Sequence, residues 1–132
     1  MISQLSPDTL RAVPEQYQGI YAHGTHIFAP QNLVFLSGQI GVAADGVTCA
    51  GFERQCHQAM DNVEALLADT DMSLPDVLRV IYYVTDVANL PILSEIRQAR
   101  WNQGQAPAVT TLVVAALAAP DLLVEIEVTA AR

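Results

Sequence analysis

The segment from residue 107 to residue 127 constrains the fold of this 132-residue chain more than any other segment. It reads as two strands, over residues 107–112 and 124–127, joined by a loop. Side chains alternate between the two faces of a strand, so Glu125 and Glu127 share one face of the second strand. We expect the two strands to be neighbours, and to bring a threonine hydroxyl of the first and a glutamate carboxylate of the second to one place.

Both faces of the expected sheet carry apolar side chains. In the first of these strands, one alternating set is Val109, Thr111 and Val113, and the other is Thr110, Leu112 and Val114. Apolar side chains on each face need a cover that removes them from water. Two helices can cover one face, and another copy of the chain can cover the second. We therefore expect a homo-oligomer.

The composition indicates one globular domain. The chain has a mass of 14.2 kDa and is 52% hydrophobic and only 15% charged, unlike a disordered protein. No apolar run approaches the roughly 18 residues of a membrane-spanning helix, and the first residues lack the pattern of a secretory signal. We expect an N-terminal arm over residues 1–18, one domain over residues 19–132, and a cytoplasmic protein with no membrane partner.

The net charge of −8 bears on the choice of partners. All six basic residues are arginines, and Arg97 and Arg100 are the only close pair. Nucleic acids bind proteins through clustered lysine and arginine side chains, which displace counterions from the phosphates. We therefore expect no nucleic-acid partner.

Hydrophobic periodicity predicts two helices and several strands. A first helix is expected over residues 51–68, with an outward face made of Glu53, Gln55, Gln58, Asp61 and Glu64. A second helix is expected over residues 90–103, closed by Gly104. Strands are expected near residues 19–22, 33–37, 77–84, 109–115 and 122–130. The predicted fold class is α+β, with two helices packed on one face of the sheet.

Glu125, Glu127 and Ser37 are candidates for a site, and each has a plainer interpretation. A carboxylate covered by another subunit is partly desolvated, which favours its protonated form and suits proton transfer. Alternatively, the two glutamates are solvated positions at a rim. Ser37 is either a hydrogen-bonding residue of the site or an ordinary hydroxyl at the end of a strand.

The remaining reactive side chains suggest neither a metal nor a redox centre. His23 and His26 lack an evident third ligand, so we expect no metal site. Cys49 and Cys56 match neither a disulfide framework nor a zinc motif. We expect both to be reduced thiols.

Six short segments of the chain match sequence motifs of a known protein family: residues 19–21, 36–40, 58–63, 83–86, 107–111 and 124–127. Together they resemble the reactive-intermediate deaminase family, also called RidA, YjgF or L-PSP, over residues 19–131. The resemblance implies a chorismate-mutase-like α+β fold, a homotrimer, and three equivalent clefts between subunits. It also implies a cofactor-free hydrolase that converts reactive enamines and imines, such as 2-aminoacrylate, to 2-keto acids and ammonia.

The resemblance also assigns roles to particular residues. The glutamate that positions or activates the attacking water corresponds to Glu125. The tyrosine and the serine that line the cleft correspond to Tyr21 and Ser37, and Thr111 falls where a pocket residue offers backbone contacts. The arginine that grips the substrate carboxylate corresponds to Val109, which has neither charge nor donor.

Val109 is the departure on which the function depends. A bidentate arginine–carboxylate pair supplies charge-assisted hydrogen bonds of about 1.5–3 kcal/mol each. Arg97 and Arg100 lie on a helix that can approach the rim, but neither is an evident replacement in the sequence. An apolar floor favours a neutral or aromatic ligand, or a carboxylate held elsewhere.

Two functions remain open. The first is a deaminase or related hydrolase of a small metabolite other than 2-aminoacrylate, in an inter-subunit cleft, with Glu125 handling the water. The second is a trimer that binds or responds to a small ligand without chemistry. Ribonuclease, a third label of the family, is disfavoured by the acidic charge.

Overall fold

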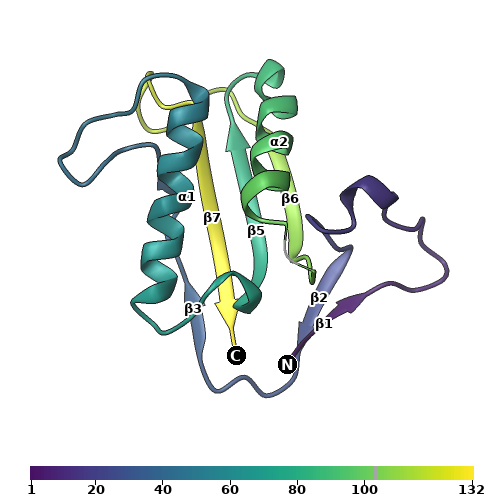
Figure 1. Ribbon diagram of the computed structural model, residues 1–132. Helices are drawn as coiled ribbons and strands as arrows, with labels where there is room; N and C mark the ends of the chain where they lie inside the picture. The colour runs from purple at the N-terminus through teal and green to yellow at the C-terminus, as the bar shows by residue number, and fades with distance from the viewer. Residues whose placement is uncertain (103) are drawn as a thin grey trace.

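The computed structural model describes residues 1–102 and 104–132. Its main elements are β1 Ile2–Leu5, β2 Gly24–Ile27, β3 Leu33–Phe35, β4 Gln39–Ile40, α1 Phe52–Ala68, β5 Val77–Val84, α2 Leu90–Arg100, β6 Ala108–Val113 and β7 Val124–Ala131. Three short 3-10 helices, η1 Glu15–Tyr17, η2 Leu74–Asp76 and η3 Val87–Asn89, join them. Figure 1 shows α1 and α2 lying side by side across the main sheet.

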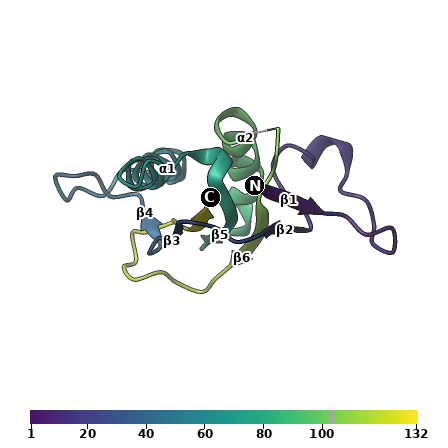
Figure 2. The same ribbon diagram turned by 90° about the horizontal axis from the view of Figure 1, so that it is seen from below.

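The main sheet is mixed, with the strand order β3-β7-β5-β6 and with β4 also paired to β7. Only β5 and β6 run parallel, and the other pairs are antiparallel. Both helices lie on the same face of this sheet (Figure 2). The predicted α+β class, with two helices on one sheet face, is confirmed.

The expected pairing of the last two strands is wrong. β6 and β7 are consecutive in the sequence, but β5 lies between them in the sheet. The chain leaves β6, crosses the end of β5 and returns antiparallel to it as β7. The residues of β6 therefore meet β5 rather than the glutamates of β7.

The core lies between the helices and the sheet. In β7, Val124, Ile126 and Val128 are buried, while Glu125 and Glu127 are half-buried on the other face. β5 alternates in the same way, with Val80, Tyr82 and Val84 toward the helices. The prediction that the apolar face of the last strand meets the helices is confirmed.

Helix α1 begins and ends where its periodicity predicts, but the prediction for Gln55 is wrong. Its side chain is 2% exposed rather than outward-facing. Its Nε2 donates to the carbonyls of Cys49 and Asp121 at 3.0 and 2.9 Å, and its Oε1 accepts from the Leu123 N–H at 2.8 Å. A buried amide is tolerated here because two loops supply its hydrogen-bond partners.

Helix α2 ends at Arg100, earlier than predicted, and the predicted end at Gln103 lies outside the described residues. The backbone leaves the helical conformation at Trp101, whose φ is −117°. The indole of Trp101 is buried beside Tyr82, with the ring centroids 6.4 Å apart. Burying this large side chain directs the chain into the core and ends the helix before Gly104.

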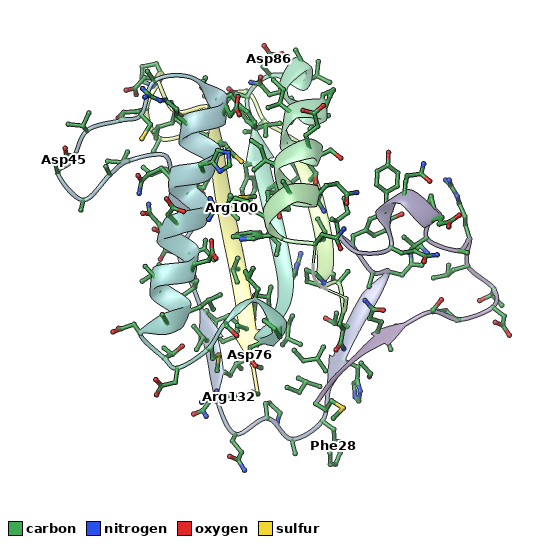
Figure 3. All side chains as sticks on the ribbon, viewed as in Figure 1. Phe28, Asp45, Asp76, Asp86, Arg100 and Arg132 are labelled. Carbon is green, nitrogen blue, oxygen red and sulfur yellow. The ribbon has the colours of Figure 1, made fainter. Side chains whose placement is uncertain are left out.

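An arginine joins the two helices. Arg100 at the end of α2 donates to Asp61 Oδ1 at 2.8 Å and to Glu64, both on α1, and to the carbonyl of His57 at 3.1 Å. Figure 3 places Arg100 between the helices. Its charge is therefore neutralised by two carboxylates.

The N-terminal arm is more ordered than predicted. Residues 2–5 form β1, which pairs antiparallel with β2, and η1 follows. The strand expected over residues 19–22 begins instead at Gly24, although Ala22 makes an isolated bridge to Ala108 at the edge of β6. In the described part of the chain, no helix is both long enough and apolar enough to cross a membrane.

Candidate functional site

Three of the predicted site residues line one hollow at the edge of the sheet. Val109 and Thr111 pair in register with Val80 and Tyr82 of β5, so their side chains point to the helix face. Together with Tyr21 they border a hollow of about 360 Å³. The rest of its lining comes from the N-terminal arm and α2: Arg11, Pro14, Tyr17, Ile20, Ser94 and Arg97. The hollow is large enough for a small metabolite.

A buried arginine forms part of this hollow. Arg97 is only 9% exposed. Its Nη2 donates to the Ile20 carbonyl at 3.0 Å, and its guanidinium carbon lies 4.6 Å from the centroid of the Tyr82 ring, a cation–π distance. Burial raises the pKa of Tyr82, and the nearby Arg97 charge offsets part of that rise. The phenol is therefore neutral at physiological pH.

The other two predicted residues lie elsewhere. Glu125 on β7 is in register with Tyr83 on β5 and with Ile40 on β4, so it points to the face of the sheet that the helices do not cover. A Cβ at Gly38 would overlap the Glu125 carboxylate, which places that carboxylate directly against the Gly38 backbone. The exposed Ser37 precedes Gly38 and completes this second group.

The five predicted residues thus form two groups on opposite faces of the sheet. Neither Glu125 nor Ser37 is among the residues that line the hollow beside Val109. A single copy of the chain does not bring all five together. The expected meeting of a hydroxyl and a carboxylate on neighbouring strands is wrong, because β5 separates β6 from β7.

Sequence reasoning missed Arg11 and Tyr17, and considered Arg97 without placing it at the site. The helical position of Arg97 was readable from periodicity, but its burial over Tyr82 was not. Among the described residues, no three His, Cys, Asp or Glu side chains gather closely enough to hold a metal ion. Cys49 and Cys56 are free thiols.

Comparison with known proteins identifies the family. A family model described as "Endoribonuclease L-PSP" matches residues 16–132. The chain is 28% identical over 116 residues to a protein of Escherichia coli (strain K12) named "Putative reactive intermediate deaminase TdcF", which covers 86% of this chain and 88% of that protein.

Solved structures of Rid proteins have the same fold as this chain. YyfB from Yersinia pestis, titled a protein of unknown function of the conserved Rid protein family, superposes with a TM-score of 0.85 at 27% identity over 99% of this chain and 98% of that one. RidA from the Antarctic bacterium Psychrobacter sp. PAMC 21119 gives a TM-score of 0.71 at 27% identity, over 98% of this chain and 99% of that one. The chain therefore belongs to the RidA, or L-PSP, family.

Proposed function

We propose that this protein is a cofactor-free deaminase, or a related hydrolase, of a small enamine or imine other than 2-aminoacrylate. The proposal draws on membership of the family and on a relative named as a reactive intermediate deaminase. The observation that carries it is the position of Glu125. This carboxylate is half-buried on the sheet face that the two helices leave uncovered.

The site of this reaction is a cleft between copies of the chain in a homotrimer. The uncovered sheet face exposes apolar side chains, among them Leu33, Phe35 and Leu112, with exposed fractions of 52%, 73% and 45%. An exposed apolar face of this kind is typical of an interface. A second copy seated there would bring its own Tyr21, Val109 and Thr111 toward the Ser37–Glu125 group.

The proposed chemistry is the hydrolysis of a carbon–nitrogen double bond. Glu125 accepts a proton from water as the water oxygen bonds to the imine carbon. The same carboxyl group returns this proton to the nitrogen, which gives a carbinolamine. Glu125 then takes the proton of the new hydroxyl group and passes it to the amino nitrogen as the carbon–nitrogen bond breaks, so that a keto acid and ammonia leave. Tyr21, Ser37 and Thr111 bind the substrate, and no metal or organic cofactor takes part.

Val109 determines which substrates are excluded. An isopropyl group offers no donor to a carboxylate, so the smallest imino acids lose the contact that would hold them. The same residue favours the alternative function, a trimer that binds or responds to a small ligand without turnover. Ribonuclease activity is not part of the proposal, because a chain of net charge −8 is poorly suited to a phosphate backbone.

One assay distinguishes the deaminase from the non-catalytic, ligand-binding trimer. An amino-acid oxidase generates 2-iminopropionate and longer or aromatic imino acids, semicarbazide traps the imine that remains, and ammonia release is followed. The deaminase is expected to accelerate ammonia release from a longer or aromatic imine, and Glu125→Gln to reduce that rate at least a hundredfold. Glu127→Gln, a carboxylate on the same face, serves as the matched control.

Three results would contradict parts of the proposal. Full activity of Glu125→Gln would remove this residue from the reaction. No ammonia from any imine, together with saturable binding of a small ligand, would favour the non-catalytic alternative. Light scattering that gives a mass of one chain, rather than three times 14.2 kDa, would exclude the inter-subunit cleft.

A further inference from the structure

The hollow beside Val109 carries two positive charges and no negative one. Arg11 and Arg97 are two of its nine lining residues, although the chain has only six basic residues. None of the fourteen acidic residues lines it. In a protein of net charge −8, such a space attracts an anion.

Arg97 is a buried cation without an ion pair in the described part of the chain. A guanidinium has five N–H donors. One donates to the Ile20 carbonyl, and the Tyr82 side chain is a further hydrogen-bonding neighbour. Arg100, one turn further along α2, instead contacts both Asp61 and Glu64. Burial of an unpaired charge is costly, and a bound anion removes that cost.

Arg97 borders the hollow with a guanidinium that the surrounding residues hold in place. Among the described side chains, only Trp101 Nε1 is both fully buried and without a hydrogen-bond partner. No nitrogen of Arg97 is therefore both fully buried and without a partner, and this residue lines the hollow. Stacking on Tyr82 and the bond to Ile20 hold the guanidinium in place, so little entropy is lost when a ligand binds.

We propose that Arg97, with Arg11 as a second cation, binds the carboxylate of a ligand whose body is apolar or aromatic. Arg97 stacks on Tyr82 of β5. Tyr82 is in register with Thr111, and Val80, two positions earlier on β5, is in register with Val109. The cation missing from position 109 is thereby supplied from helix α2. Tyr17, Tyr21 and Pro14 line the same hollow and suit an apolar body larger than a methyl group.

This inference rests on the proposed function only for the identity of the reaction, and binding tests it separately. The probes are benzoate, phenylacetate and 3-phenylpropanoate, each compared with its neutral amide by calorimetry and by the fluorescence of Trp101, the only tryptophan. At least one carboxylate is expected to bind tenfold or more tightly than its amide. Equal or absent binding of all three pairs would overturn the proposal.

The variants assign the preference to Arg97. Arg97→Gln removes the charge, and is expected to weaken carboxylate binding at least tenfold while amide binding changes less. Arg54→Gln, at an exposed position of α1, is the matched control. Undiminished carboxylate binding by folded Arg97→Gln would overturn the proposal.

A second variant leaves Arg97 in place and so does not depend on the folding of Arg97→Gln. Val109→Glu puts a carboxylate into the hollow beside the guanidinium, and is expected to abolish binding of the probe carboxylates. Val109→Gln, of the same length without the charge, is expected to weaken this binding much less. Equal binding by these two variants would argue against an anion site.

The imine assay distinguishes failure of this proposal from failure of the proposed function. If the hydrolase acts on an aromatic imino acid, Arg97→Gln is expected to raise KM at least tenfold with a smaller change in kcat. Carboxylate binding that depends on Arg97, with no ammonia release, would leave the anion site standing and reject the deaminase. Turnover that depends on Glu125, with KM unchanged in Arg97→Gln, would support the deaminase and reject the anion site.

Discussion

Tyr83 on β5 donates a hydrogen bond of 2.8 Å from its hydroxyl to Oε1 of Glu127 on β7. The two residues are diagonal neighbours, because Tyr83 is in register with Glu125 and Ile81 is in register with Glu127. The bond occupies Glu127 and leaves Glu125 without this phenol as a partner. Of the two glutamates on this strand face, Glu127 is therefore the one that the Tyr83 phenol holds.

The Tyr83–Glu127 bond predicts a particular dependence of stability on pH. Because Glu127 accepts a hydrogen bond from the neutral phenol, the pKa of Tyr83 lies above its ordinary value of 10.0. Below about pH 10 the phenol is protonated in the folded and the unfolded chain, so the contribution of the bond is complete. Above that pH the unfolded chain loses its proton first, and the contribution disappears as pH rises through the folded pKa.

We therefore expect Tyr83→Phe to be less stable than the wild type at about pH 8, and the difference to shrink by about pH 11. Urea unfolding at the two pH values measures it. Phenolate absorbance gives a second reading: the Tyr83 pKa is expected to fall toward 10.0 in Glu127→Gln. A stability difference that grows with pH would contradict the assigned cause.

Gln55 is predicted to be a strong stability determinant. Replacing it with leucine leaves the carbonyls of Cys49 and Asp121 and the N–H of Leu123 without their partner. Unpaired buried groups cost about 1–3 kcal/mol each, so we expect a loss of roughly 3 kcal/mol in the free energy of unfolding. Gln16→Leu, at an exposed position, is the control. A loss no larger than in that control would show that the loops re-form their bonds with water.

Local patterns predicted the elements but not their long-range pairing. The alternation in 124–128 and the three-to-four spacing in α1 reflect one buried face each, and such a face is visible in the sequence. The order of the strands in the sheet is not visible in the sequence, because it depends on which strand edges pair after the chain has folded. The insertion of β5 between β6 and β7, and the pairing of the exposed β1 with β2, both have this origin.

The site was predictable to a similar extent. The family signature pointed to Tyr21, Ser37, Val109, Thr111 and Glu125, but not to their division between two sheet faces. The burial of Gln55 and Arg97 depends on loop carbonyls and an aromatic ring that tertiary folding supplies. A polar residue in an amphipathic helix is read as exposed unless such partners are known, so both were misjudged or left open.

The two thiols are expected to differ in reactivity. Burial raises the pKa of Cys56 from 9.0 to about 12, an effect that the charges of Arg100 and Arg97 only partly offset. The thiolate is the reactive form, so Cys56 should resist a thiol reagent at about pH 8. The half-buried Cys49 should react first. Mass spectrometry after brief labelling of the folded and urea-unfolded protein measures this, and rapid labelling of folded Cys49→Ser would contradict it.

The last prediction concerns the close approach of Gly38 to Glu125. A Cβ at position 38 would overlap the carboxylate, so Gly38→Ala must displace the Glu125 side chain. In the proposed reaction a displaced carboxylate would no longer meet the attacking water, so we expect kcat of imine hydrolysis to fall at least tenfold while the fold is retained. Gly104→Ala is the matched control, since a Cβ there has no other atom of the described residues within 4 Å, its chain neighbours aside. Unchanged turnover in Gly38→Ala, with Glu125→Gln inactive, would mean that the carboxylate works from a second position.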